Sequence, residues 1–435
     1  MDADVPRDKP AAFLFMGDLV IVARQARLIA EAHARGLQPL LVVTPHTPAE
    51  RLAACRADPT HPLSKLAEVV EVPDATVQDV LPGIQPLLRA YDVQGVICVG
   101  DFFVEPAGIT AHCLGLPGAG AGASRMARNK LLQRTALPDL SPAFQVVTPA
   151  ERSEVDGSAI RFPVVVKPTG RFSSLGVHRV DDAERLAEVL RGYEPDEVVL
   201  IEQLVTGPEF SVESLVQHGE VIWSGVTAKQ TNEATSTSFT EMGHTSPAEY
   251  LAVADEKLLL QANVDVLQRI GFADGISHAE FRLSDGAPVL MEVATRLPGG
   301  GITFLWELAT GASLEPVMVD LALGRPVTYP QPQRRARQVY LDHPAGRLRD
   351  VTSTAAEVSW VERDDRWPYP EPVDRDAPPA ARAVLVTQHP GTLLGPQVDG
   401  EQRSGSVLFD APLDAPTDPL AARFLGEVTV VVDPT

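Results

Sequence analysis

The chain has 435 residues, 44% of them hydrophobic and 22% charged, which are the proportions of a soluble globular protein. Its net charge of −21 argues against nucleic acid or an anionic membrane surface as a partner. A chain of this length is too long for a single core, so we expect roughly two to four domains.

The three cysteines, Cys55, Cys98 and Cys113, are far apart and match no zinc or redox spacing, so we interpret them as structural. The N-terminus has no positively charged start that leads into an apolar run, and we expect no signal peptide. No apolar segment reaches the length of about 18 residues that a membrane span needs. These patterns predict a cytoplasmic protein.

The first third of the chain alternates apolar strands with helices. Strands are predicted at residues 11–17, 37–43, 67–72 and 95–100, and helices at 20–34, 77–90 and 105–114. This order predicts a parallel sheet wrapped by helices. Glu105 follows the last strand, where parallel sheets place ligands, and is a candidate for substrate binding. A helix N-terminal acid favoured by the helix dipole is the simpler explanation of the same residue.

Two lysines stand at conspicuous places in the next part of the chain. Lys130 lies on a predicted helix over residues 124–134. Lys167 closes an apolar strand, and a polar loop with Ser173 and Ser174 follows it. Backbone N–H groups and hydroxyls of such a loop can hold phosphates. The alternatives are a solvated helix face for Lys130 and a plain exposed hairpin for Lys167.

An apolar strand within residues 197–213 runs into Glu202, Gln203, Leu204 and Val205, and Glu209 follows. A strand that stops inside the protein leaves unpaired N–H and C=O groups of the kind that an adenine edge requires.

A polar stretch then connects Lys229 to a helix predicted over residues 247–270. The stretch is long for a structural connection and suits a segment that covers a substrate. Glu241 and His244 in this stretch are candidates for substrate recognition. For His244 we slightly favour the alternative of a residue at the helix start, bonded to backbone.

A predicted hairpin over residues 277–293 places Glu280 and Glu292 on neighbouring strands among apolar residues, and Arg296 follows. Two carboxylates beside an arginine suit a magnesium-bound polyphosphate. Two solvated acids on the outer face of a hairpin are an equal alternative at this point. His278 lies two residues before Glu280 and points to the same face if the strand is regular.

The register of this hairpin decides between the two interpretations. A two-residue turn at Asp285 and Gly286 would oppose Glu280 to Met291 and send Glu292 to the other face. A three-residue loop with a bulge at Gly286 opposes the two carboxylates. The metal site requires this longer loop.

The remainder of the chain is predicted as two helices followed by short strands. Gly299, Gly300 and Gly301 precede the first helix, and its free N–H groups would bind an anion. The second helix is predicted at residues 313–324. After it, short β patterns broken by Pro and Gly predict a β-rich region over residues 326–435.

Six segments occur in an order that resembles the ATP-grasp family, and within it the carboxylate–amine ligases that include the L-amino-acid (dipeptide) ligases. The segments are RNKLLQR, PVVVKP with SSLGV, IEQLVTGPEFSVE, EMGHTSPA, HAEFRL and MEVATRLPGGG. The resemblance implies an α/β and α+β multidomain chain with the ATP-grasp fold. It implies a Rossmann-like parallel-sheet domain at 1–123, an ATP-grasp domain at 124–325 with a lid at about 142–205, and a β-rich domain at 326–435.

The resemblance also assigns roles. Lys130 and Lys167 would hold the phosphates of ATP under a flap that contains Ser173 and Ser174. Glu202 would take the adenine amino group, the backbone from Gln203 through Leu204 to Val205 would contact the ring edge, and Glu209 would bind the ribose. Glu280 and Glu292 would hold one or two Mg²⁺ ions, with Mn²⁺ as a substitute. Arg296 would contact the transferred phosphate. His278, from its place on the same strand face as Glu280, would face that phosphate or the substrate carboxylate.

One departure from the family concerns the position two residues after Glu292. The family usually has an asparagine ligand there, and this chain has Ala294. The departure puts the second magnesium in doubt.

The implied function is ATP-dependent amide or peptide bond formation through an acyl phosphate, between amino acids or an amino acid and a related small acid. The alternatives are another ATP-grasp enzyme, carboxylase-like or of the purine type, and a nucleotide-binding protein without catalysis. The resemblance also allows a homodimer through the N-terminal domain.

Overall fold

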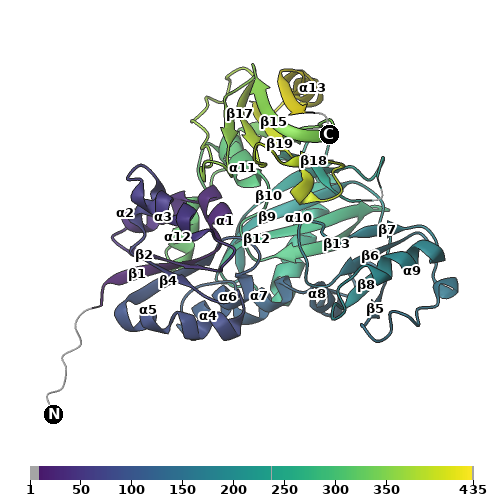
Figure 1. Cartoon of the computed structure of the whole chain (residues 1–435), viewed down its shortest axis with the longest axis horizontal. Helices are drawn as coiled ribbons and strands as arrows, with labels where there is room; N and C mark the ends of the chain where they lie inside the picture. Colours follow the sequence, from purple (N-terminus) through teal and green to yellow (C-terminus); the bar gives the residue numbers. More distant parts are fainter. Residues whose placement is uncertain (1–8, 237, 434–435) are drawn as a thin grey trace, which may run out of the picture.

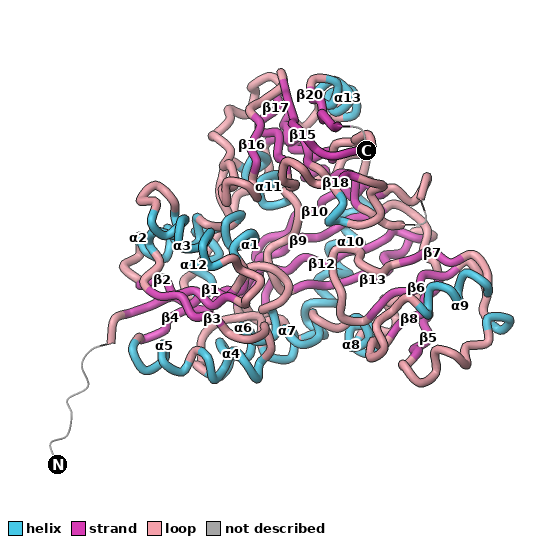
Figure 2. The backbone as a smooth tube through the Cα atoms, in the orientation of Figure 1, coloured by secondary structure: helices cyan, strands magenta, loops and turns pink. Residues whose placement is uncertain are grey.

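The structure is a computed structural model that describes residues 9–236 and 238–433 (Figure 1). Its described backbone forms four β-sheets, with helices gathered on the N-terminal sheet and along one side of the central sheet (Figure 2). The N-terminal sheet and the small sheet of residues 144–203 lie at opposite ends of the central sheet, and the C-terminal strands extend it to one side.

The N-terminal region is the predicted parallel sheet, in the order β3-β2-β1-β4. Its strands are β1 (Ala11–Met16), β2 (Gln38–Val43), β3 (Glu68–Glu71) and β4 (Asp92–Cys98). Its helices are α1 (Leu19–Arg24), α2 (Arg27–Ala34), α3 (Ala49–Ala57), α4 (Val77–Gly83), α5 (Gln85–Ala90) and α6 (Val104–Cys113), with a short 3₁₀ turn η1 (Pro62–Lys65). Two predicted helices, 20–34 and 77–90, are each divided. In the second, Pro82 and Pro86 lack the N–H that a continuous helix needs.

The predicted helix over residues 124–134 is also wrong, because the structure has α7 (Ala121–Ala127) and α8 (Lys130–Ala136) in its place. Asn129 between them is extended, and its side chain accepts the N–H of Leu132 as the N-cap of α8. Lys130 therefore begins a helix and is buried, instead of lying on a solvated helix face.

A four-stranded sheet in the order β5-β8-β6-β7 forms the end of the molecule opposite the N-terminal region (Figure 1). It contains β5 (Phe144–Val147), β6 (Val164–Pro168), β7 (His178–Val180) and β8 (Val199–Gln203), together with η2 (Gly157–Ala159) and α9 (Ala183–Arg191). Its residues fall within the predicted lid.

The central sheet has nine strands in the order β13-β12-β9-β10-β11-β14-β19-β17-β16. The strands of the middle region are β9 (Glu209–Gln217), β10 (Glu220–Thr231), β11 (Glu241–Ser246), β12 (Gly275–Ser284) and β13 (Ala287–Ala294). Those from the C-terminal region are β14 (Arg334–Tyr340), β16 (Val358–Trp360), β17 (Ala380–Val386) and β19 (Gly405–Pro412). Because β11 pairs with β14, the C-terminal strands continue the central sheet.

The remaining described elements surround this sheet. They are α10 (Val253–Ile270), α11 (Ile302–Thr310), α12 (Glu315–Ala322), α13 (Asp418–Gly426), the 3₁₀ turn η3 (Gly400–Gln402), and a sheet of β15 (Gly346–Ser353), β18 (Leu393–Leu394) and β20 (Val428–Asp433). The prediction that residues 230–246 are a loop is wrong at its end, because β11 pairs with strands on both sides. The helix after it consequently begins at Val253 and not near Pro247. No helix among the described residues could span a bilayer.

One apolar core joins the N-terminal region to the central sheet. It contains Phe15 of β1, Trp223 of β10 and Trp306 of α11. The two tryptophan rings meet edge to face with centroids 5.0 Å apart. Gly225 allows this packing, because a Cβ there would lie 2.3 Å from the Trp306 ring. This core includes residues from both sides of the predicted domain boundaries at 123 and 325, so it does not mark either boundary. Both boundaries stay predictions.

Candidate active site

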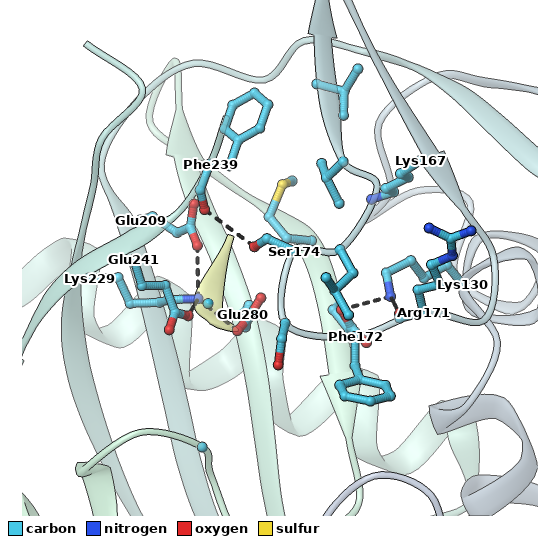
Figure 3. A pocket seen from close by; sticks show the side chains of 18 of the residues that line it. Lys130, Lys167, Arg171, Phe172, Ser174, Glu209, Lys229, Phe239, Glu241 and Glu280 are labelled. Atoms are coloured by element: carbon cyan, nitrogen blue, oxygen red, sulfur yellow. Dashed lines mark hydrogen bonds and ion pairs between the residues drawn. The ribbon is translucent and has the colours of Figure 1, made fainter. Parts of the chain in front are cut away.

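A cavity lies where the lid sheet faces the central sheet, and its empty space of about 1380 Å³ includes the solvent at its open mouth (Figure 3). Most residues singled out in the sequence line it: Lys130, Lys167, Ser173, Ser174, Glu202, Gln203, Leu204, Val205, Glu209, Glu241, His278, Glu280, Glu292, Arg296 and Gly300. His244, Gly301 and Glu105 are not among its lining residues. The space is large enough for a nucleotide and small substrates together.

The two hairpin carboxylates lie directly opposite each other, with Glu280 on β12 paired to Glu292 on β13. The predicted three-residue loop is wrong. Ser284 pairs with Ala287, which leaves a two-residue turn of Asp285 (φ 50°) and Gly286 (φ 76°). The register then shifts, because Phe281 pairs with Leu290 and Met291 is skipped. The bulge that the metal site requires is therefore at Met291 and not at Gly286.

Arg134 explains why the bulge is stable at this position. A bulge leaves one residue outside the ladder, and an unpaired buried backbone group costs free energy. The carbonyl of Met291 accepts a hydrogen bond of 2.7 Å from Nη2 of Arg134, a fully buried arginine on α8. The side chain of Met291 lines the cavity. A contact between distant segments thus determines the face that Glu292 occupies.

His278 lies on the same face as Glu280, with Nε2 3.1 Å from Oε1 of that carboxylate. Its Nδ1 is 2.8 Å from Oε1 of Glu213, which is fully buried and directly opposite on β9. Burial lowers the pKa of His278, but the two carboxylates outweigh burial and raise this pKa to about 9. His278 is therefore a cation at neutral pH. Trp306 donates to Glu213 at 3.0 Å, which joins the core to the site.

Lys229 is a site residue that the sequence analysis missed. Its Nζ lies 2.7 Å from Glu280, 2.7 Å from Glu241 and 2.9 Å from Glu209 (Figure 3). Burial lowers the pKa of Lys229, but the three carboxylates outweigh burial and raise it well above its usual value. A signal for this residue existed, because Lys229 lies near the end of a largely apolar strand, as Lys167 does.

Lys130 and Lys167 lie across the cavity from the Lys229 cluster (Figure 3). Lys130 Nζ is 3.0 Å from Oε2 of Glu292 and donates to the Arg171 carbonyl at 2.7 Å. Lys167 Nζ is 2.7 Å from Oε2 of Glu202. Two cations thus face the hairpin acids and the end of β8.

The predicted flap, with Ser173 and Ser174 at positive φ, touches three distant parts of the chain. Ser174 donates to the carbonyl of Phe239 at 3.3 Å, and the Ser173 carbonyl accepts from the N–H of Gly400 at 3.4 Å. The neighbouring Phe172 ring meets Phe102 of the N-terminal region edge to face, at 4.9 Å. The flap therefore covers the cavity.

Glu202 is buried between two cations, with Oε1 2.7 Å from Arg134 Nε and Oε2 bonded to Lys167. Burial raises the pKa of Glu202, and Lys167 and Arg134 more than offset this, so the pKa lies below its usual value. Beyond the strand, Leu204 has no backbone hydrogen bond to any described residue, whereas the Val205 carbonyl accepts from Arg282 at 3.0 Å. A free backbone edge therefore remains at Leu204.

Arg296 reaches the cavity and forms an ion pair of 2.8 Å with Asp101, which follows β4. The end of this strand was expected to contribute Glu105. The structure places Glu105 outside the cavity, 3.6 Å from Arg125. Asp101 is the acidic residue that meets the site from this strand.

Of the other residues expected to bind substrate, Gly300 lines the cavity, whereas His244 and Gly301 do not. His244 lies within β11 and not at a helix start, buried, with Nδ1 3.2 Å from Gln338 Oε1. Its Nε2 is 3.3 Å from Glu241 Oε2. The N–H of Gly301, expected to be free for an anion, donates to Gln338 at 2.9 Å. Gly300 lines the cavity at φ 59°, and a Cβ there would lie 2.9 Å from the Tyr340 hydroxyl.

The hairpin carboxylates, Glu280 and Glu292, are too few to hold a metal ion by protein ligands alone, but they suit magnesium. Among the described residues, no three His, Cys, Asp or Glu side chains gather into a metal-binding group. Mg²⁺ commonly takes one or two protein carboxylates and completes its shell with waters and substrate phosphates. Glu280 and Glu292, facing one another across the bulge, provide such a pair.

Comparisons with known proteins agree on one family. The sequence profile of the ATP-grasp domain matches residues 160–304. A D-alanine–D-alanine ligase of Anaeromyxobacter sp. is 31% identical over 217 residues, which are 47% of this chain and 68% of the ligase. The uncharacterized protein y4rH of Sinorhizobium fredii is 28% identical over 85% of this chain and 75% of its own. Three further curated relatives are matched over 42%, 38% and 37% of their own length.

The crystal structure of an L-amino acid ligase from Bacillus licheniformis superposes with a TM-score of 0.75. It is 19% identical and covers 98% of this chain and 100% of that one, so it supports the fold alone. The predicted architecture, a parallel N-terminal sheet followed by a mixed α/β body and β-rich C-terminal strands, is confirmed.

Proposed function

Because this chain belongs to the ATP-grasp family, in its carboxylate–amine ligase branch, we propose that it is a ligase that joins two small molecules through an amide bond. In the first step an oxygen of a substrate carboxylate attacks the γ-phosphorus of ATP, which yields an acyl phosphate and releases ADP. In the second step an amine attacks the acyl carbon, loses a proton and displaces inorganic phosphate. The proposed substrates are amino acids, or an amino acid and a related small acid.

One observation carries this proposal: Glu280 and Glu292 are opposed across a bulge, with cations on both sides of the pair. Lys130 approaches from one side and Lys229 from the other. Charge on a transferred phosphoryl group is stabilised mainly by such fixed cations and by bound metal, and catalysis of this type needs no protein nucleophile. A structural hairpin would gain nothing from two facing carboxylates that are only about a quarter exposed.

Magnesium would be held by Glu280 and Glu292, and when bound it neutralises phosphate charge and aligns the phosphoryl group for transfer. Ala294 offers no ligand at the position where the family usually has asparagine. We propose that Lys130 and Lys167 hold phosphates, that the free backbone edge at Leu204 binds adenine, and that Glu209 binds ribose. Arg296, fixed by Asp101, would hold the transferred phosphate.

Phosphate release from ATP and magnesium, measured over a panel of amino acids singly and in pairs, tests the proposal. We expect release that depends on particular amino acids and a condensation product in mass spectrometry. Release that responds to bicarbonate and not to amino acids would indicate a carboxylase-like enzyme. ATP binding without release under any condition would indicate a nucleotide-binding protein, the alternative that Ala294 favours.

Lys167→Ala is expected to weaken the binding of Mg·ATP by roughly 10- to 100-fold, the value of a hydrogen bond to a charged group. Burial lowers the pKa of Lys167 to about 8, with Glu202 opposing this shift. The lysine is charged below this pH and loses its proton above it. Nucleotide affinity of the unaltered protein should therefore fall between about pH 7 and pH 9, and the variant should lose this dependence.

Calorimetric titration with a non-hydrolysable ATP analogue across this pH range measures both effects. Lys257→Ala, which removes an exposed lysine from α10, is the matched control. Equal affinity of the Lys167 variant and the unaltered protein would remove the phosphate role of this residue.

A further inference from the structure

Among the described residues of the C-terminal region, one charged side chain lines the cavity. Arg403 lies between η3 and the start of β19, more than a hundred positions after the hairpin acids, and lines the cavity beside Glu241. None of the sequence motifs includes it. The same segment contacts the flap, because the N–H of Gly400 lies 3.4 Å from the Ser173 carbonyl. The segment that leads into β19 thus forms one end of the cavity wall.

The guanidinium of Arg403 is held in one orientation. It lies over the ring of Tyr340, with Cζ 4.1 Å from the ring centroid. Its Nε donates to the Gly400 carbonyl at 3.0 Å, and its Nη1 donates to the Glu241 carbonyl at 3.3 Å. Nη2 has no hydrogen-bond partner among the described residues. One edge of a fixed arginine is therefore free at the cavity wall.

The charge of Arg403 is only partly balanced by protein. Its ion pair with Glu241 is 3.4 Å long, whereas Glu241 makes a much shorter one of 2.7 Å with Lys229. A second arginine, Arg24 of α1, lies nearby but outside the cavity lining, and it pairs with Glu362 at 3.9 Å. Burial lowers the pKa of Arg24, and the charge of Arg403 adds to this lowering. This end of the cavity is therefore suited to an anion.

The position of Arg403 relative to the hairpin acids indicates which anion. Consecutive ion pairs connect Glu280 to Lys229, Lys229 to Glu241 and Glu241 to Arg403. Lys229 and Glu241 therefore stand between Arg403 and the phosphoryl transfer site. The carboxylate that becomes phosphorylated must lie at the hairpin acids, so a carboxylate at Arg403 belongs to the other substrate.

We propose that Arg403 is a specificity residue that binds the free carboxylate of the amine substrate, so that the enzyme selects an amino acid and not a simple amine as nucleophile. The assignment rests on the proposed ligase function. Arg403 is suited to this task because its charge is permanent and its Nη2, which has no partner among the described residues, can donate to a carboxylate oxygen. Glu241, beside it, would then face the substrate's amino end.

The test compares an amine substrate with its own carboxamide. For each productive pair from the amino-acid panel, mass spectrometry of the product identifies the partner that acts as the amine. We then measure kcat/KM by phosphate release for this amino acid and for its carboxamide, with the unaltered enzyme, Arg403→Gln and Arg403→Lys. If Arg403 had only a structural role, each substitution would lower kcat/KM for the amino acid and for its carboxamide by the same factor.

The unaltered enzyme should prefer the free carboxylate by roughly 10- to 100-fold. In Arg403→Gln this preference should fall to about one, mainly through KM for the amine. Arg403→Lys should keep part of the preference, because a lysine has the charge but not the planar guanidinium that Tyr340 and Gly400 hold in place. Arg363→Gln is the matched control: Arg363 also lies over an aromatic ring, that of Trp360, and pairs with a carboxylate, but it is exposed and away from the cavity. The Arg363→Gln enzyme should prefer the free carboxylate over the carboxamide as strongly as the unaltered enzyme does.

An Arg403→Gln enzyme that keeps the preference overturns the assignment while leaving the ligase function intact. An unaltered enzyme that uses acid and carboxamide equally well has the same consequence. If no amino acid stimulates phosphate release, the ligase function fails first and the role of Arg403 fails with it. Should Arg403→Gln not fold, as judged by thermal melting, Arg403→Lys decides the question: a reduced preference supports the assignment, and an unchanged preference overturns it.

Discussion

Glu292→Gln is expected to abolish ATP-dependent phosphate release, with a loss of about a thousandfold or more. The substitution keeps the size of the side chain and removes the charge that would hold magnesium. Within the described part of the chain the Glu292 carboxylate makes one ion pair, with Lys130 at 3.0 Å, and a quarter of its surface is exposed. The fold should therefore tolerate the change, with a melting temperature close to that of the unaltered protein.

Steady-state phosphate release with the productive substrates measures this effect, and thermal melting reports the fold. Glu220→Gln, an exposed glutamate on β10, is the control and should retain full activity. Turnover of the Glu292 variant within a few-fold of normal would eliminate this residue as a metal ligand. A loss of turnover accompanied by unfolding would be uninformative about the metal, and the melting curve separates the two outcomes.

Lys229→Met is expected to have the largest effect on stability, a loss of about 3–5 kcal/mol in the free energy of unfolding at neutral pH. Methionine fills a similar volume but leaves Glu209, Glu241 and Glu280 facing one another without their shared cation. Removal of one partner from a buried ionic cluster costs more than the cluster contributes as a whole, because the remaining charges lose their compensation.

The pH dependence of this loss follows from the carboxylates. Burial raises the pKa of Glu241. Lys229 and His244 lower this pKa by more than burial raises it, so it lies well below its usual value. Without Lys229 these acids take up protons more readily in the folded state, and protonation relieves their repulsion. The difference in stability between the two proteins should therefore shrink as the pH falls from about 7 towards 5.

Urea unfolding at both pH values, followed by circular dichroism, measures this prediction. Lys257→Met removes an exposed lysine from α10 and should change stability by less than about 0.5 kcal/mol. A Lys229 variant as stable as the unaltered protein would show that the cluster does not depend on this cation. A deficit that grows as the pH falls would contradict the proposed repulsion between carboxylates.

Local patterns of sequence predicted most of the strands of the N-terminal sheet and the hairpin, and much of the cavity lining, but not β11 or the division of three helices. Apolar periodicity and turn residues predicted the parallel N-terminal sheet and the hairpin, because strands and turns are encoded over a few neighbouring residues. Lysines that end apolar strands predicted Lys167 in the same way. The family motifs located Glu202, Glu209, Glu280 and Glu292, since each motif places its functional residue within one short segment.

Contacts between distant segments decided the rest of the site. The hairpin turn alone predicts the wrong face for Glu292, and the bulge at Met291 that corrects it is held by Arg134 on α8. Asp101 meets Arg296 from the N-terminal region, and Arg403 reaches Glu241 from the C-terminal strands. The free energy of such an arrangement depends on hydrogen bonds and charges that meet only after the sheets have assembled. The sequence by itself therefore determined which chemical groups the protein has, and the tertiary structure decided which of them face one another.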